Sequence, residues 1–207
     1  KSMAPLLYGV FSWVIIKLTR PKIQHKVAVL LVTITMLYPL LSLTKTFPHQ
    51  SIIEYVENIN IDRAQSLQYR FDNESILLER AQERILFGWG GWGRNRVYNE
   101  DTGKDVSTTD GRWIMVIGSL GIFGFIAEFG MIAFTVIRAS VASKLLKEKK
   151  EQNLLAANTL IVGIIMINLL PNSSFFPFFW LFIGMLLGRS EMIIAESKMV
   201  HQGQTES

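Results

Sequence analysis

The chain contains no cysteine, only three histidines among its 207 residues, and few charged side chains, which account for 18% of the sequence. The absence of cysteine excludes disulfide bonds, thiolate metal ligands and a cysteine nucleophile. The histidines are widely separated, so they form no metal-ligand pattern, and we expect neither a metal ion nor another cofactor. Hydrophobic residues make up 49% of the chain and are gathered in long runs, which is typical of a polytopic membrane protein.

Five apolar segments predict an all-α fold, a polytopic bundle of transmembrane helices. They cover approximately residues 4–18, 27–43, 113–137, 154–170 and 175–187. A span usually needs roughly 20 apolar residues, so we expect the shorter segments to use flanking residues as well. Because the chain opens at Lys1 and its first apolar run follows almost at once, we expect residues 1–207 to be a single membrane domain from the C-terminal part of a longer protein.

The distribution of basic residues predicts the orientation of these segments. The connections after the first and third segments are rich in lysine and arginine: Lys17, Arg20, Lys22 and Lys26, and then Arg138, Lys144, Lys147, Lys149 and Lys150. Positively charged loops of this kind remain in the cytoplasm. Residues 45–112 are then a large extracytoplasmic loop, and residues 189–207 are a cytoplasmic tail that we expect to be disordered after about Ser197. The net charge of +4 therefore reflects membrane orientation and indicates no nucleic acid partner.

The large loop differs from the cytoplasmic loops in the kind of basic residue that it carries. It has two lysines but seven arginines: Arg63, Arg70, Arg80, Arg84, Arg94, Arg96 and Arg112. Planar guanidinium groups suit bidentate binding of phosphate or carboxylate. The alternative is a solvated face with ordinary ion pairs, because the loop is also rich in acids. Residues 62–87 lack proline and glycine and predict a helix, with Asp72-Asn73 as a place where it could break and restart.

The stretch "ILFGWGGWGRNR", from Ile85 to Arg96, contains the glycine spacing of a dinucleotide-binding loop. That fingerprint must follow a strand and open a helix, whereas here it follows a predicted helix and precedes a polar loop. We therefore reject a Rossmann site. Two alternatives remain for this glycine turn: an interfacial turn anchored by Trp89 and Trp92, or a pocket in which backbone amides approach a lipid-linked phosphate.

Three features of the loop together resemble the O-antigen ligase and polysaccharide polymerase superfamily, membrane glycosyltransferases that use undecaprenyl-pyrophosphate-linked sugars. They are Arg70, the stretch "RILFGWG" from Arg84 to Gly90, and "GIFG" from Gly121 to Gly124. The resemblance covers roughly residues 63–130, while the flanking helices match in hydropathy alone. The chain departs from the family pattern at two places: Leu86-Phe87 replaces a proline, and Asp110-Gly111 stands at the position of a His-Asn pair.

The resemblance implies a multi-pass enzyme of the bacterial inner membrane that transfers a glycan from an undecaprenyl-pyrophosphate carrier to an acceptor sugar, without a nucleotide cofactor. Its implied partners are the lipid-linked glycan, an acceptor glycan or glycolipid, and membrane lipid. Arg70, then Arg94 and Arg96, are the candidate pyrophosphate ligands, because arginine stays charged and grips phosphate oxygens by parallel hydrogen bonds. Asp110 is the candidate catalytic base in place of the family histidine.

Ligase and polymerase both remain open. In a polymerase another acid could act as the base, and the loop offers Glu54, Glu57, Asp101 and Asp105. A different class of function, a transporter or flippase of lipid-linked sugars, is suggested by Glu128, which lies inside an apolar segment where an ionisable side chain is costly. The alternative for Glu128 is a buried carboxylate with a hydrogen-bond partner. A transporter binds its substrate near the bilayer midplane, whereas the polar residues here gather in an outer loop, which favours the enzyme.

Overall fold

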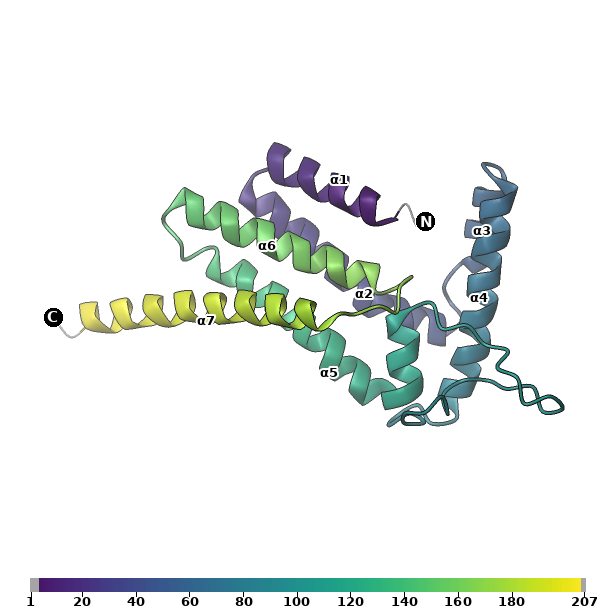
Figure 1. Ribbon diagram of the computed structural model, residues 1–207. Helices are drawn as coiled ribbons and strands as arrows, with labels where there is room; N and C mark the ends of the chain where they lie inside the picture. The colour runs from purple at the N-terminus through teal and green to yellow at the C-terminus, as the bar shows by residue number, and fades with distance from the viewer. Residues whose placement is uncertain (1–3, 206–207) are drawn as a thin grey trace. The chain divides into compact units, whose positions relative to one another are not determined.

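The computed structural model describes residues 4–205 and is all-α (Figure 1). This part of the chain forms seven helices: α1 (Ala4–Leu18), α2 (Pro21–Leu43), α3 (His49–Glu57), α4 (Ile61–Gln82), α5 (Arg112–Ala142), α6 (Lys149–Asn168) and α7 (Pro177–Thr205). They belong to two compact units. The loop unit comprises Met36–Glu128 and Leu169–Ser174, and the bundle unit comprises the rest of the described chain.

Three helices are long and apolar enough to cross a bilayer: α2, α5 and the Pro177–Met199 part of α7. Together they suggest a multi-pass membrane protein. The other two predicted segments are helical as well, but α1 has only 15 residues, and α6 carries Lys149, Lys150 and Glu151 in its first turn. The tail predicted to be disordered after Ser197 instead continues α7 to Thr205. Ile193 and Ile194 of α7 are buried, so packing extends this helix beyond its apolar run.

The bundle unit is held together by close approach of helices at small residues. Gly163 of α6 lies against Ala28 of α2, where an added Cβ would meet backbone and side-chain atoms at 3.0 to 3.2 Å. Small residues at helix crossings allow such close packing in membrane proteins. Buried apolar side chains from α5, α6 and α7, among them Ile132, Leu160 and Ile183, complete this core.

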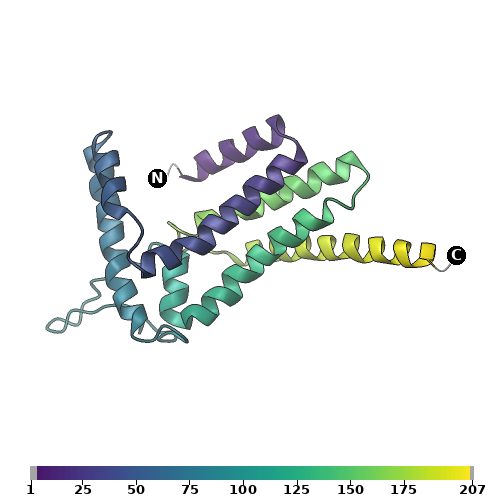
Figure 2. The same cartoon turned by 180° about the vertical axis from the view of Figure 1, so that it is seen from behind.

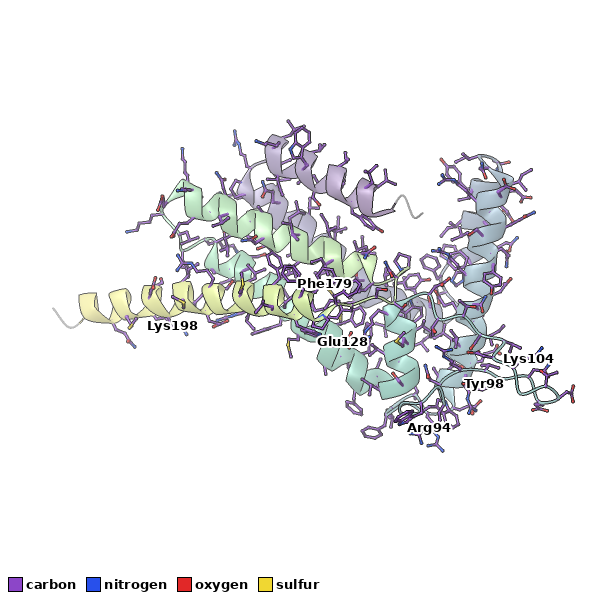
Figure 3. The ribbon with its side chains drawn as sticks, in the orientation of Figure 1. Arg94, Tyr98, Lys104, Glu128, Phe179 and Lys198 are labelled. Carbon is purple, nitrogen blue, oxygen red and sulfur yellow. The ribbon has the colours of Figure 1, made fainter. Side chains whose placement is uncertain are left out.

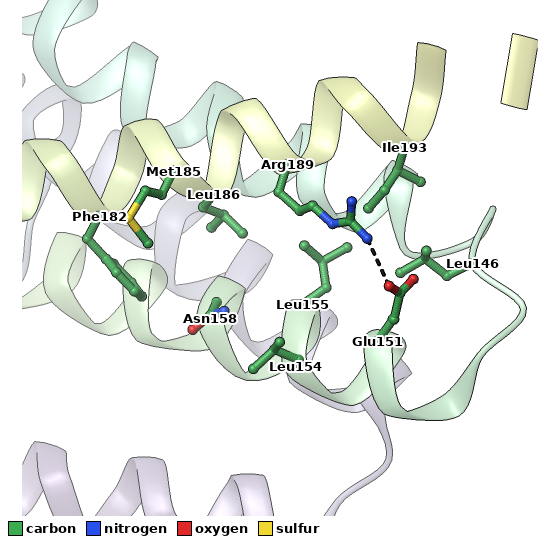
Figure 4. A pocket seen from close by; sticks show the side chains of 10 residues that line it. All are labelled: Leu146, Glu151, Leu154, Leu155, Asn158, Phe182, Met185, Leu186, Arg189 and Ile193. Atoms are coloured by element: carbon green, nitrogen blue, oxygen red, sulfur yellow. Dashed lines mark hydrogen bonds and ion pairs between the residues drawn. The ribbon is translucent and has the colours of Figure 1, made fainter. Parts of the chain in front are cut away.

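An apolar groove lies between α6 and α7, with a volume of about 260 Å³ (Figure 4). Leu155, Phe182 and Leu186 form part of its walls. At one end, Arg189 Nη2 donates to Glu151 Oε1 at 2.9 Å, which pairs α7 with the first turn of α6. The acid in the first turn of α6 is thus neutralised by a partner on α7.

Helix α5 is broken near its start, as both views show (Figures 1 and 2). Gly121 has φ 70° and ψ −169°, a conformation that interrupts the helix and favours glycine. The break folds α5 back on itself, because Arg112 Nε and Nη2 donate to the two Glu128 oxygens at 2.7 and 2.9 Å. In a straight helix these residues would be about 24 Å apart. Glu128 is therefore a paired carboxylate, partnered within its own helical element.

The glycine turn at residues 85–90 supplies the backbone partners that the break in α5 leaves without bonds. In a continuous helix the carbonyls of Gly118 and Ser119 would accept from residues 122 and 123. Here they accept from the amides of Trp89 and Gly90, each at 2.8 Å. In exchange, Ile122 N donates to the carbonyl of Ile85 at 2.8 Å. The two glycine motifs of the sequence thus bind each other, backbone to backbone.

Helix α4 matches the predicted helix in part. Asn60 caps its beginning, since its Oδ1 accepts from Arg63 N at 2.9 Å. The helix runs without the break considered at Asp72-Asn73, because Asn73 is buried and does not cap a helix. It ends at Gln82, five residues before the predicted limit at Phe87, where the chain turns toward α5. Helix α3, which the sequence did not predict, packs beside α4 (Figure 1).

Replacing Gly121 with alanine tests this docking. The added Cβ would lie 2.2 Å from the Leu86 carbonyl oxygen in a backbone conformation that alanine resists, so we expect a loss of at least about 2 kcal/mol of stability. Thermal unfolding in detergent, followed by tryptophan fluorescence, measures it. Gly184→Ala is the control, because a Cβ there meets nothing within 4 Å and should leave the midpoint unchanged or slightly raised. Equal midpoints for the two variants would contradict the docking.

Candidate functional site

The loop unit contains a cavity of about 200 Å³ between α4, the end of α2 and the chain that precedes α5. Its polar wall is formed by Tyr38, Arg70, Glu74, Thr108 and Asp110. Apolar residues close the remainder, including Leu170 and Pro171 from the short connection between α6 and α7. Two predicted site residues, Arg70 and Asp110, therefore meet at one place although they are 40 positions apart in the sequence.

Arg70 and Asp110 form a loose ion pair. Arg70 Nε lies 3.6 Å from Asp110 Oδ2, which is longer than a hydrogen bond, and the two side chains are 48% and 38% exposed. An exposed pair of this length contributes little to stability. Its consequence is chemical, because the guanidinium retains donors that can turn toward an added anion.

Asn73 positions the segment that carries Asp110. Its side chain is buried, its Nδ2 donates to the Tyr69 carbonyl at 2.8 Å, and its Oδ1 accepts from Thr108 N at 2.9 Å. The Tyr69 hydroxyl lies 3.1 Å from Thr108 Oγ1 and adds a second link. The residue that looked like a helix breaker thus fixes the distance between α4 and the loop that enters α5.

Glu74 is the carboxyl group of this cavity with an unusual environment. Its side chain is 15% exposed, and the Tyr38 hydroxyl lies 2.8 and 2.9 Å from its two oxygens. Burial raises the pKa of Glu74 to about 7, although the hydrogen bond from Tyr38 acts in the opposite direction. His49 Nε2 lies 3.9 Å from Glu74 Oε1, and burial lowers the pKa of His49, so this histidine is neutral at pH 7.

Arg94 and Arg96, the other predicted pyrophosphate ligands, do not line this cavity. They lie in the segment that follows the glycine turn, where Figure 3 labels Arg94 and Tyr98. Arg94 Nε donates to the Gly91 carbonyl at 3.2 Å, and Arg96 Nη1 forms a 2.7 Å ion pair with Asp105. Both guanidinium groups thus bind partners within their own loop, as expected where acids accompany arginines.

Three amides of the glycine turn already have backbone partners. The amide of Gly88 donates to the carbonyl of Arg84, and those of Trp89 and Gly90 donate to α5. Trp89 Nε1 donates to the Arg80 carbonyl at 2.8 Å, and the guanidinium groups of Arg80 and Arg84 lie 3.5 and 4.3 Å from its ring centre. Of the two alternatives for this turn, these contacts favour a turn with a structural role over a phosphate-binding pocket.

Sequence reasoning missed Glu74 and Tyr38. Two signals could have found them. Glu74 follows Arg70 by four residues and so shares its helix face, and Tyr38 is a polar side chain near the end of an apolar segment. Neither signal predicts burial, which is what sets the pKa of Glu74 apart. Glu54, Glu57, Asp101 and Asp105, the other acids considered as bases, are not among the residues that line the cavity.

The raised pKa of Glu74 predicts a pH-dependent stability. Between its ordinary value of 4.5 and about 7 the folded protein holds a proton that the unfolded chain releases, so the contribution of Glu74 to stability falls as pH rises through this window. We expect a loss of up to about 3 kcal/mol from this group. Unfolding midpoints measured from about pH 4.5 to about pH 7 check it.

Glu74→Gln should remove this contribution, because glutamine does not titrate, so the stability difference between wild type and variant should change with pH. His49, whose pKa burial lowers, acts in the opposite direction on both proteins and cancels in this difference. The matched control is Glu79→Gln, a more exposed position on the same helix, which should keep the wild-type dependence. A difference for Glu74→Gln that is constant across the window contradicts the assignment, as does an equal change in both variants.

A comparison of the chain with known protein families, curated proteins and solved structures gives no match.

Proposed function

We propose that this chain is part of a bacterial membrane glycosyltransferase that moves a glycan from an undecaprenyl-pyrophosphate carrier to the hydroxyl of an acceptor sugar. One observation carries the proposal. Arg70, an exposed cation suited to pyrophosphate, shares a cavity with Glu74, a partly buried carboxyl group whose pKa is raised to about 7. Pyrophosphate binding and proton removal are the two tasks that such a transfer requires.

The proposed step displaces the carrier at the anomeric carbon. The acceptor oxygen forms a bond to that carbon, the bond to the pyrophosphate oxygen breaks, and both electrons of the broken bond leave with the carrier pyrophosphate. Arg70 stabilises the negative charge that develops there. Glu74 takes the proton of the acceptor hydroxyl, since a base with a pKa near the working pH is the most effective.

The size of the cavity is compatible with these roles of Arg70 and Glu74. At about 200 Å³ it is smaller than a typical small-molecule pocket, so it can enclose the reacting groups while the glycan and the polyprenyl chain extend beyond it. Asp110, predicted from the sequence as the base, is held 3.6 Å from Arg70 and is the group that orients this arginine in the proposal. It remains the second candidate for the base.

A transporter or flippase of lipid-linked sugars is the alternative, and its main support in the sequence was Glu128. This carboxylate is 11% exposed and receives two hydrogen bonds from Arg112. The break in α5 brings Arg112 to this carboxylate, and the resulting ion pair explains why an ionisable side chain lies in an apolar segment. Glu128 therefore adds no independent support for a transport path.

Arg70→Ala should abolish long surface polysaccharide and cause lipid-linked units to accumulate on the outer face of the membrane. We expect transfer to fall by about 100-fold or more, as for removal of other groups that stabilise developing charge. Complementation of a deletion strain, with gel ladders and membrane expression monitored, measures the effect. Arg63→Ala is the control, because Arg63 lies on the same helix outside the cavity lining. A silent Arg70→Ala, or units trapped on the inner face, contradicts the proposal.

The base can be identified from a pH–rate profile of the solubilised enzyme with a labelled lipid-linked donor. If Glu74 is the base, the rate rises with pH and levels off above about 7, since the base must be ionised. Glu74→Gln should then lower the rate by about 100-fold or more and remove the rise of the rate with pH. Asp110→Asn should lower the rate about tenfold and keep that rise. The reverse pattern would make Asp110 the base.

A further inference from the structure

A second, larger cavity lies in the bundle unit, where the beginning of α2, the end of α5 and the beginning of α6 converge. Its volume is about 780 Å³. The residues that carry its chemistry are Lys22, His25, Lys26, Ser140, Ser143 and Lys144. None of them belongs to the loop unit, so this cavity is separate from the candidate transfer site.

The charge of this cavity has one sign. Lys22, Lys26 and Lys144 line it, and the described residues of its lining include no aspartate or glutamate. Glu151, an acid of the first turn of α6, is bonded to Arg189 on α7. Helix α2 begins here with Pro21, so the positive end of its dipole adds to this charge. The lining of the cavity is therefore suited to binding an anion.

A buried polar wall accompanies the lysines. His25 is 7% exposed, and its Nδ1 lies 3.3 Å from Ser140 Oγ. Its Nε2 is buried and has no hydrogen-bond partner among the described residues. His25 and Ser140 thus place polar groups in the wall of the cavity, beside the three lysines.

The position of the cavity along the helices indicates where its ligand comes from. It lies at the ends of two candidate spans, α2 and α5, and its three lysines are among the basic residues that the positive-inside pattern places in the cytoplasm. Basic pockets between helices on this side of a membrane bind the headgroups of anionic lipids. Val29, one turn further into α2, adds an apolar side chain to the lining, next to which an acyl chain can lie.

We propose that this cavity binds the phosphate headgroup of an anionic phospholipid from the cytoplasmic leaflet. Lys22, Lys26 and Lys144 supply the charge, and His25 and Ser143 supply the polar wall. The site is independent of the proposed transferase activity. Its expected roles are to hold α2, α5 and α6 together and to fix their depth in the membrane.

Binding can be measured by native mass spectrometry of the full chain in detergent, titrated with short-chain phosphatidylglycerol or phosphatidylcholine. We expect one phosphatidylglycerol to bind in preference to phosphatidylcholine. The triple variant Lys22→Gln, Lys26→Gln, Lys144→Gln should weaken this binding by about tenfold or more. Val29→Phe, which fills space without changing charge, should weaken it as well.

The matched control removes the same charge from lysines near these positions in the sequence that do not line the cavity: Lys17→Gln, Lys147→Gln, Lys149→Gln. It should bind phosphatidylglycerol as the wild type does. Equal losses in the two triple variants would mean diffuse surface charge and overturn the proposal, as would equal binding of phosphatidylcholine. Glycerol 3-phosphate or inorganic phosphate that binds as tightly as the lipid would assign the cavity to a soluble phosphate instead.

Discussion

The loop unit depends on one exchange of backbone hydrogen bonds, between the glycine turn at residues 85–90 and the break in α5 at Gly121. A broken helix leaves amides and carbonyls without partners, and such groups are costly wherever water is scarce. The turn provides both donors and acceptors for them, at 2.8 Å for the three shorter bonds. This exchange ties the end of α4 to the beginning of α5. It thereby brings together the two segments that carry Arg70 and Asp110, and it lets Arg112 reach Glu128.

Composition and hydrophobic runs were sufficient to predict the helical class and the three long apolar helices. A helix that can cross a bilayer needs a long apolar segment, and such a segment is visible in the sequence itself. They failed at the ends of elements. The limit at Gln82 depends on where the chain must turn to meet α5, and the continuation of α7 past its apolar run accompanies the burial of Ile193 and Ile194. Both are tertiary effects that local sequence does not contain.

The candidate site, too, could be predicted from the sequence only in part. The sequence singled out Arg70 and Asp110 through the family resemblance, and the structure brings them together, although their roles in catalysis remain proposals. Glu74 was hidden because its special property is burial against Tyr38, a residue 36 positions earlier. The glycine spacing was conspicuous in the sequence, yet the amides of Gly88 and Gly90 are bonded to backbone carbonyls. The spacing of the glycines identifies a turn, but only its hydrogen bonds show which groups the turn binds.

The fold-back of α5 also changes how depth in the membrane is read from this sequence. A hydropathy profile treats Arg112–Ala142 as one rod, with Arg112 at its rim and Glu128 far inside. Because the two side chains touch, they lie at one level, and the uninterrupted part of the helix is residues 122–142, about 31 Å long. This length is close to the thickness of a hydrocarbon core, about 30 Å. The 16 positions that separate the arginine from the carboxylate in the sequence therefore do not measure a difference in depth.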